Sequence, residues 1–279
     1  MTRILLATLL AVGAGTALAD DCQFQAQRDL DLPVEGLKQL RLQTRAGDLR
    51  VNGVAGLKKI EVRGKACASS AESLEQLQLQ HNRDGAMLGI ATTSPEATGG
   101  GSLWGSNYAY IDLDVRVPES FDLDLTDSSG DIEIDDIGAI ELTDSSGDIR
   151  IRNAHGDVRI KDSSGDINVD RADGNVTVAV DSSGDIEING VRRNVTIDQD
   201  SSGDIEIENV DGDARVDNDS SGDIDFDRIG GNADVGSDTS GGIVADNVKG
   251  DFTVQHKSGG RSGIRHSNIG GKVSLPEHD

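Results

Sequence analysis

Residues 181–188 read Asp-Ser-Ser-Gly-Asp-Ile-Glu-Ile, and this stretch decides the fold because the chain repeats it. The hexapeptide Asp-Ser-Ser-Gly-Asp-Ile occurs six times and then decays to Asp-Thr-Ser-Gly-Gly-Ile. Its copies, spaced by 17, 18, 19, 19, 19 and 19 residues, begin at Asp127, Asp144, Asp162, Asp181, Asp200, Asp219 and Asp238. A regular period of this length is the signature of a stacked repeat, in which each unit buries its apolar face against its neighbours.

Each repeat contains two strand patterns. The first is Gly-Asp-Ile-x-Ile, and an offset pattern such as residues 156–160, Gly-Asp-Val-Arg-Ile, follows nine or ten residues later. Alternating apolar and polar residues are typical of half-buried strands, and parallel strands on successive coils lie about 4.8 Å apart. The sequence therefore predicts an all-β fold, a parallel β-helix or β-solenoid with coils of about 19 residues and two strands per coil. Ile and Val suit its narrow interior.

The alternation also assigns the two faces of each strand. In the repeat at 181–188, Ile186 and Ile188 are expected to point inward, and Asp185, Glu187 and Asn189 outward. Over the six coils from 130 to 227, the outward positions of the first strand hold 14 acids in 18 positions, against 6 in 18 for the second strand. The negative charge is thus predicted to lie mainly on one sheet.

The repeated Asp-Ser-Ser-Gly turn does not have the pattern of an active site. A catalytic serine needs one base and one oxyanion site, whereas this motif occurs six times and contains no histidine. A turn role explains every position, because Asp accepts a backbone N–H in an Asx-turn and Gly supplies a positive φ. We therefore predict no catalytic residues and no enzyme activity.

Stacked coils would align the repeated carboxylates in two columns, one from Asp127 to Asp238 and one from Asp131 to Asp223. Neighbours about 5 Å apart repel by about 1 kcal/mol per pair even in water. Solvation of an acidic face, Asx-turn hydrogen bonds or bound cations could offset this cost, and Ca²⁺ is the cofactor that prefers such oxygen ligands. Its candidate ligands are Asp144, Asp148, Asp162, Asp166, Asp181, Asp185, Asp200, Asp204, Asp219 and Asp223.

Residues 1–19 have the pattern of a secretory signal peptide. A single Arg3 precedes an apolar run from Ile4 to about Ala14, and Ala-Leu-Ala at 17–19 is a cleavage site. The apolar run is too short for a transmembrane span, and a buried N-terminal helix is the alternative. We expect an exported protein of the periplasm, the extracellular space or the cell envelope. Its two cysteines, Cys22 and Cys67, would then form a disulfide rather than remain two unrelated thiols.

The segment 20–118 lacks the clean repeat but is rich in strand patterns. Residues 45–51 read Arg-Ala-Gly-Asp-Leu-Arg-Val, a degenerate copy of the repeat, so this part is expected to form the first, irregular coils. Residues 70–78 fit a short helix capped by Ser70, with a strand as the alternative. A glycine-rich loop at 98–102 is followed by three aromatic residues that either contact a ligand or cover a loop: Trp104, Tyr108 and Tyr110.

The segment 119–279 contains the regular repeats and ends in a coil of different character. Basic residues replace the acids there, and we interpret this end as a cap on the open edge of the solenoid. The net charge of −24 excludes nucleic acid as a natural partner, because phosphate binding requires Lys and Arg.

Residues 115–118 (Val-Arg-Val-Pro), 121–125 (Phe-Asp-Leu-Asp-Leu) and the repeated Ser-Gly-Asp-Ile-x-Ile resemble a bacterial putative-adhesin family of β-strand-repeat proteins with a domain of unknown function. The resemblance implies a right-handed parallel β-helix in an exported or envelope protein and brings no catalytic residues. Our first hypothesis is an adhesin-like binding module whose acidic face engages a cationic or calcium-bridged envelope or extracellular protein or glycan. The alternatives are a polysaccharide-acting β-helix enzyme and a passive envelope spacer. The irregular places where an enzyme site could lie are Arg150 and Arg152 next to Asp148 and Asp166, and the loop from Gly99 to Tyr110.

Overall fold

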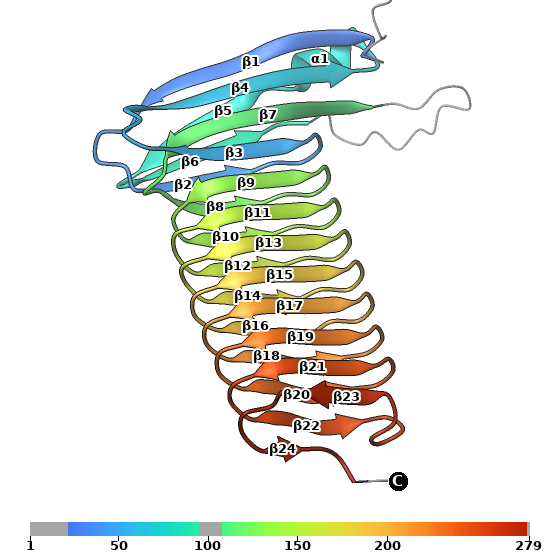
Figure 1. Ribbon diagram of the computed structural model, residues 1–279. Coiled ribbons are helices and arrows are strands. Elements are labelled where there is room, and N and C mark those ends of the chain that lie inside the picture. Colours follow the sequence, from blue (N-terminus) through green and yellow to red (C-terminus); the bar gives the residue numbers. More distant parts are fainter. Residues whose placement is uncertain (1–21, 95–107, 278–279) are drawn as a thin grey trace, which may run out of the picture.

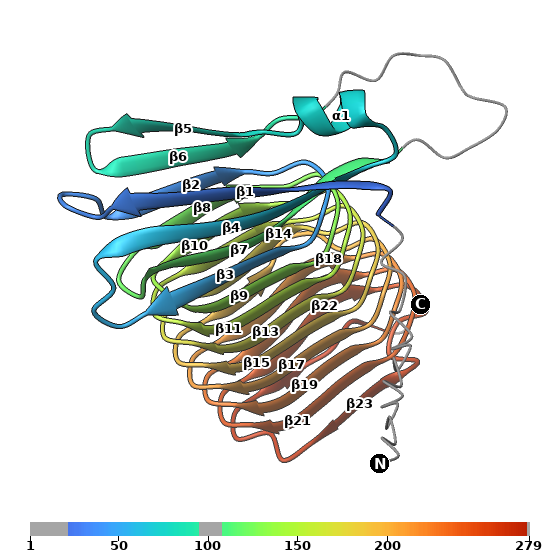
Figure 2. The same ribbon diagram turned by 90° about the horizontal axis from the view of Figure 1, so that it is seen from above.

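Two mainly parallel sheets face each other across an apolar interior and together form a β-solenoid of about 8 turns (Figures 1 and 2). The computed structural model describes residues 22–94 and 108–277. Each of the two sheets has twelve strands. The fold class predicted from the repeat is confirmed.

Sheet 1 carries the Gly-Asp-Ile-x-Ile strands. In spatial order its strands are β1 (Phe24–Pro33), β4 (Lys59–Ala68), β7 (Ala109–Pro118), β3 (Leu49–Val54), β9 (Ile132–Ile137), β11 (Ile149–Ala154), β13 (Ile167–Ala172), β15 (Ile186–Val191), β17 (Ile205–Val210), β19 (Ile224–Ile229), β21 (Ile243–Val248) and β23 (Ile264–Ser267).

Sheet 2 carries the offset strands. Its order is β24 (Val273–Ser274), β22 (Phe252–Lys257), β20 (Ala233–Asp238), β18 (Ala214–Asp219), β16 (Val195–Ile197), β14 (Val176–Val180), β12 (Val158–Lys161), β10 (Ile140–Thr143), β8 (Asp122–Thr126), β2 (Gln39–Gln43), β6 (Met87–Thr92) and β5 (Leu79–Asp84). Each regular coil therefore contributes one strand to each sheet, as Figure 1 shows from β9 downward.

The interior is a stack of β-branched side chains in register. Ile186 and Ile188 of β15 pair with Ile205 and Ile207 of β17, and all four are at most 1% exposed. Branched side chains pack well on a pleated surface, and the narrow space between the sheets leaves little room for rings. Phe226 is among the few aromatic residues that are fully buried.

Glycine is required at the turn that leads into each sheet 1 strand. Gly184 has φ +129°, and a Cβ at this position would overlap the carbonyl oxygen of Gly165 in the coil before it. L-residues rarely adopt such a φ, so both the conformation and the close approach exclude a side chain. The turn role predicted for this glycine is confirmed.

A second left-handed position lies within the sheet 1 strands, and the sequence reasoning did not foresee it. Asn153, Arg171 and Arg228 have φ between 55° and 65° there. The bend lets the next residue, such as Ala154, turn back into the interior, where it is 1% exposed. Asn and Asp tolerate this conformation better than most residues, but Arg does not share that property.

The N-terminal part joins the same two sheets. Residues 45–51 occupy the place of a regular turn and strand, since Gly47 has φ +112°, Ala46 bridges Ser129, and β3 pairs in parallel with β9. Beyond β3 the pairing changes, because β4 is antiparallel to both β1 and β7. The antiparallel hairpin β5–β6 extends sheet 2 in the same way (Figure 2).

The short helix expected near Ser70 is present. Helix α1 spans Ala71–Gln76, and the Ser70 hydroxyl accepts the backbone N–H of Ser73 at 3.0 Å. Capping of a free N–H group by a serine oxygen favours a helix over the strand alternative at this point.

Candidate functional site

The carboxylate column from Asp131 to Asp223 is exposed, as expected, and has a structural role in each turn. The Oδ1 of Asp185 accepts the backbone N–H of Asp204 at 2.9 Å, and Asp166 accepts that of Asp185 at 2.9 Å. The same bond joins each member to the next coil along Asp48, Asp131, Asp148, Asp166, Asp185, Asp204 and Asp223. We call these residues the exposed column. The bond satisfies a backbone donor at the point where the strand begins.

The column from Asp127 to Asp238 is buried, so the solvated acidic face that the sequence suggested as one way to offset its charge was wrong for these residues. Its seven members are between 0% and 3% exposed: Asp127, Asp144, Asp162, Asp181, Asp200, Asp219 and Asp238. We call them the buried column. The sequence held a signal for this, because Val158, Ile160 and Asp162 continue one inward alternation at the end of β12. Other coils have one extra residue before the aspartate, which interrupts the alternation, so the burial of that aspartate cannot be predicted from it.

The buried column ends in two different residues. Thr44, 8% exposed, holds the equivalent position in the first coil, and its N–H donates to the Thr126 carbonyl beside Asp127. At the other end Lys257 lies opposite Asp238 in the strand register. Its ammonium is 2.6 Å from both the Asp238 Oδ2 and the Gly241 carbonyl oxygen. Sequence reasoning placed Lys257 in a basic terminal cap and missed that its side chain is buried.

Hydrogen bonds satisfy only part of the buried column. The Asp181 Oδ1 accepts the Ser182 N–H at 2.8 Å, and Asp219 accepts the Ser221 N–H at 3.1 Å. The Asx-turn role expected for this aspartate is thus present at Asp219. Both carboxylate oxygens of Asp127, Asp144 and Asp200 have no hydrogen-bond donor, although buried polar atoms normally have one.

The energy of a fully ionised column would be large. At an effective dielectric constant of about 20, two charges about 5 Å apart repel by about 3 kcal/mol. Summed over the column this reaches about 15–20 kcal/mol, more than the 5–15 kcal/mol that stabilises a typical domain. The buried column therefore cannot be fully charged without compensation.

The pKa values reflect this cost. Burial raises the pKa of Asp200 to about 7, and the negative charges of Asp219 and Asp181 add to that effect. Burial also raises the pKa of Asp127 above its usual range. The remaining members with a raised pKa reach about 6 for the same reason: Asp144, Asp162, Asp181 and Asp219.

The outward face of sheet 1 carries the rows of acids that the alternation predicted. One row follows the strand register through Arg50, Glu133, Arg150, Asn168, Glu187, Glu206 and Asp225. Its lower end consists of three acids on successive coils, which we call the carboxylate row: Glu187, Glu206 and Asp225. These three make no ion pair with any described residue, and Glu187 accepts a hydrogen bond from Asn168 at 2.8 Å.

Crowding of like charges changes two members of this row. A hydrogen bond to Glu208 raises the pKa of Glu206, with burial and the neighbouring charges adding to it. Burial and the charges of Asp246 and Asp227 raise the pKa of Asp225. The row is therefore an electrostatically unfavourable arrangement in the isolated protein, and a positive group placed against it would relieve the repulsion.

Acids beside the carboxylate row are paired with arginines. Arg152 bonds Asp135 at 2.6 Å and also contacts Glu133. Arg228 pairs with Glu208 and Asp227. Arg150, which sequence analysis grouped with Arg152, makes no ion pair with any described residue. The two arginines therefore differ in their pairing, and an enzymatic role for them stays a prediction.

A groove of about 510 Å³ crosses sheet 1 where the antiparallel strands join the regular coils. Its lining includes the exposed carboxylates Asp131 and Asp148 together with Arg50, Arg63 and Arg150. Arg50 bonds Glu133 at 2.7 Å. The groove combines donors and acceptors, but the Oδ1 atoms of Asp131 and Asp148 already accept backbone N–H groups.

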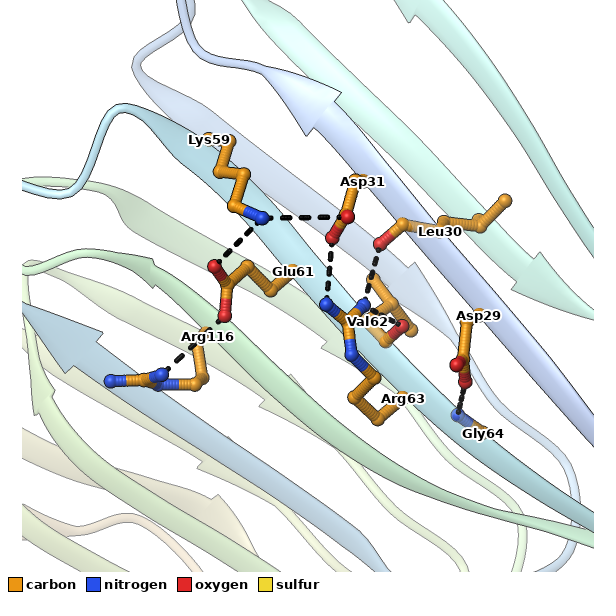
Figure 3. A network of polar contacts seen from close by, with 9 residues as sticks. All are labelled: Asp29, Leu30, Asp31, Lys59, Glu61, Val62, Arg63, Gly64 and Arg116. Carbon is orange, nitrogen blue, oxygen red and sulfur yellow. Dashed lines mark hydrogen bonds and ion pairs between the residues drawn. The ribbon is translucent and has the colours of Figure 1, made fainter.

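Arg63 links the groove to a network on the antiparallel strands (Figure 3). Its guanidinium bonds Asp31 at 2.9 Å, and Lys59 bonds both Asp31 at 3.4 Å and Glu61 at 3.1 Å. Arg116 completes the chain through Glu61. Such exposed pairs contribute about 1 kcal/mol or less each, and their alternation along β1, β4 and β7 favours the antiparallel register.

The family model described as Toastrack DUF4097 matches residues 23–198. The chain belongs to the Toastrack DUF4097 family. The match covers the antiparallel strands and the first regular coils, so this Toastrack protein keeps its family pattern through both irregular and regular parts. The resemblance noted from the sequence is confirmed at the level of a β-repeat domain of unknown function.

Several solved structures resemble this Toastrack chain at low identity. A putative adhesin from Bacteroides fragilis NCTC 9343 is 12% identical, covers 90% of this chain and 97% of its own, and gives a TM-score of 0.42. A putative lipid binding protein from Parabacteroides distasonis ATCC 8503 is 12% identical with 90% and 96% coverage and a TM-score of 0.40. Similarity at this level carries no argument about function. No curated protein sequence matches the chain.

The other residues singled out from the sequence lie at the N-terminal end. The Sγ atoms of Cys22 and Cys67 are joined in a disulfide, which connects the start of the Toastrack domain to β4. The rings of Tyr108 and Tyr110 are tilted by 39° with centroids 6.2 Å apart, and the Tyr108 hydroxyl accepts the Gln23 N–H at 3.0 Å. Trp104 lies outside the described residues. A ligand-binding role for these aromatic residues stays a prediction.

Within the part of the Toastrack chain that the structure describes, no group of three or more His, Cys, Asp or Glu is arranged to hold a metal ion. The structure divides the ten calcium candidates into five exposed and five buried residues. Calcium binding by them stays a prediction. Across the same described ranges, no helix is long and apolar enough to cross a membrane.

Proposed function

We propose that the protein is an exported, non-catalytic binding module of the cell envelope that engages a cationic or cation-bridged partner through the outward face of sheet 1. The observation that carries the proposal is the carboxylate row Glu187, Glu206 and Asp225. These three acids lie in register on successive parallel coils, and none has an ion pair among the described residues.

The geometry of the row favours a repetitive partner. Parallel strands hold neighbouring acids about 4.8 Å apart, so a chain with regularly spaced amines could pair with several of them at once. The raised pKa values of Glu206 and Asp225 indicate a site where a positive charge would be stabilised. Complementary charge would also accelerate encounter with the partner.

Export is supported by the chemistry of the N-terminal end. A disulfide such as Cys22–Cys67 persists in oxidising compartments and is rare in the cytosol. The signal-peptide pattern of residues 1–19 leads to the same localisation. The partner would then be a protein or glycan of the envelope or the extracellular space.

Calcium would act in this proposal as a bridge. Ca²⁺ takes six to eight oxygen ligands, and the carboxylate row together with nearby exposed-column members such as Asp204 and Asp223 offers only part of that number. An anionic glycan would supply the remaining oxygens. This arrangement differs from direct pairing with amines, because it requires the free metal ion.

The test compares two triple variants with the same change of charge. Glu187→Gln/Glu206→Gln/Asp225→Asn neutralises the carboxylate row, and Glu141→Gln/Asp198→Asn/Asp234→Asn neutralises three acids of sheet 2 and its adjoining turn. Binding to immobilised poly-lysine at physiological salt is measured by interferometry. We expect the row variant to lose at least about tenfold in affinity, a difference of about 1.4 kcal/mol, and the sheet 2 variant to lose less than about threefold.

A second arm measures binding to polygalacturonate with Ca²⁺ and with chelator. Binding that requires Ca²⁺ and is lost in the row variant supports bridging, whereas binding to poly-lysine alone supports direct pairing. Equal losses in the two triple variants, or no binding to either polymer, would overturn the proposed site and leave the passive spacer as the better account.

A further inference from the structure

We propose that the buried column is a proton-sharing site: neighbouring aspartates hold protons between them in the folded protein, so the solenoid takes up several protons on folding and is stabilised by mild acid. This inference is independent of the proposed binding function, because it concerns side chains inside the coil.

The geometry of the column requires shared protons or another positive charge. The backbone N–H of each aspartate from Asp127 to Asp200 donates to the carbonyl just before the aspartate of the next coil, and Asp219 lies opposite Asp238 in the strand register, so each carboxyl is placed beside the next. The pKa values of Asp181 and Asp200, and those of Asp200 and Asp219, depend on hydrogen bonding between the two side chains of each pair, as expected for neighbours that share a proton. Without it, both oxygens of Asp200 lack any donor.

The groups that face the column leave few other sources of positive charge. Above it is the neutral Thr44, whose hydroxyl donates to the Thr126 carbonyl at 3.5 Å. The turns contribute backbone N–H groups of serines, such as Ser182 to Asp181. From the exposed column, Asp148 adds negative charge against Asp162. The facing strands of sheet 1 present Ile and Val, which carry no charge.

Lys257 shows how a cation is bound at the end of the buried column. The lysine takes the place of the next aspartate, and its ammonium lies between the Asp238 carboxylate and the Gly241 carbonyl, 2.6 Å from each. Its side chain is 2% exposed. From Thr44 to Asp219 the structure gives no side-chain cation in contact with the column. A proton can supply positive charge to the buried column without extra space and without the further ligands that a metal ion would need.

The direction of proton uptake follows from the raised pKa values. Five members titrate at about 6 to 7 in the folded protein, against 3.8 when the carboxyl is unperturbed. The stabilisation is therefore fully present below about pH 4 and is lost as the pH rises through 6 to 7. Carboxylates whose folded-state pKa is lowered by ion pairs act in the opposite direction, because protonation removes those interactions as the pH falls.

The first experiment measures urea unfolding of the intact protein from pH 5 to pH 8. Uptake of two protons on folding makes the unfolding equilibrium constant rise about a hundredfold per pH unit, and we expect at least this slope between pH 5 and 6.5. The infrared C=O stretch of protonated carboxyl groups is measured in parallel on the folded protein. A stability that is flat or rises over this interval, with no protonated carboxyl signal at pH 5, would overturn the proposal.

The second experiment compares Asp181→Asn with Asp185→Asn. Both remove one carboxylate from the same coil and keep the shape of the side chain, but Asp181 belongs to the buried column and Asp185 to the exposed column. We expect Asp181→Asn to lower the pH slope by about one proton, a tenfold smaller change per pH unit, and to make the protein more resistant to urea at pH 8. Asp185→Asn leaves the slope unchanged.

A third arm distinguishes protons from metal ions. The wild-type protein is unfolded at pH 8 with Ca²⁺ and with chelator. Equal midpoints are expected even at this pH, where the column has lost most of its protons and a metal ion would bind most readily. A Ca²⁺-dependent shift that Asp181→Asn abolishes and Asp185→Asn does not would overturn proton sharing in favour of a metal in the column. Equal pH slopes in the two variants would overturn it as well.

Discussion

Lys257 occupies the strand position of Asp238 one coil further on, and the two form an ion pair inside the solenoid. The ammonium–carboxylate distance is 2.6 Å, and the side chains are 2% and 0% exposed. A column of identical acids thus ends in a base of opposite charge. A solenoid needs an atypical last coil, and in this chain the atypical residue neutralises the column as well as ending it.

Replacement of this lysine should therefore be costly. Lys257→Met keeps an apolar stem but leaves the Asp238 carboxylate buried without its cation, and loss of one partner of a buried pair costs about 3–5 kcal/mol. The loss should be smaller at pH 5 than at pH 8, because Asp238 can take up a proton when the lysine is absent. Urea unfolding at both pH values measures the effect.

Lys272→Met is the matched control, because Lys272 lies in the same end of the chain but is exposed. Its effect should be within about 0.5 kcal/mol of zero. A loss for Lys257→Met that equals the control would show that the buried pair contributes nothing.

The glycine at the turn gives a second prediction. Gly184→Ala places a methyl group against the Gly165 carbonyl at φ +129°, so strain and overlap together should cost about 3 kcal/mol or more. Gly85→Ala is the control, since Gly85 also has a positive φ but has open space around it. It should cost about 1 kcal/mol. Thermal unfolding of both variants gives the comparison, and similar losses would contradict the role of the close approach.

Much of this arrangement could be predicted from the repeat, and the exceptions have physical causes. The period near 19 fixed the coil, and the alternation around Ile186 and Ile188 fixed the two faces. The burial of the first aspartate in each repeat was missed because Asp is rarely buried. The alternation that would place Asp181 inside is also broken by one extra residue after Val178.

The antiparallel pairing at the N-terminal end could not be predicted from the sequence for a different reason. Pairing of β1 with β4 and of β4 with β7 joins segments far apart in the sequence, and no local pattern specifies such partners. Lys257 was interpreted as part of a basic cap, because its burial depends on the carboxylate of the coil before it. Both features come from contacts between coils rather than from the period of the sequence.

The exposed column supports a third prediction. Asp185→Ala removes the acceptor of the Asp204 N–H, and loss of such a bond should cost about 1 kcal/mol. Glu187→Ala, two residues away on the same strand, removes one charge without a backbone bond and should cost less than about 0.5 kcal/mol. Hydrogen exchange at the Asp204 amide measures the local effect. Unchanged protection in Asp185→Ala would show that the side chain does not hold the turn.

The disulfide leads to the last prediction, which concerns one part of the molecule. Cys22 and Cys67 close a loop with a sequence separation of 45 residues, and a bond of this kind stabilises by about 2–4 kcal/mol through the unfolded chain. Reduction should loosen β1 first, because β1 lies at the edge of sheet 1 and pairs only with β4 among the described strands. Amide hydrogen exchange with and without reductant measures this, with β17 as the internal reference. Exchange should accelerate in β1 and β4 and stay constant in β17, since each coil contacts only its neighbours. Uniform acceleration through both regions would mean that the disulfide stabilises the whole solenoid as one cooperative unit.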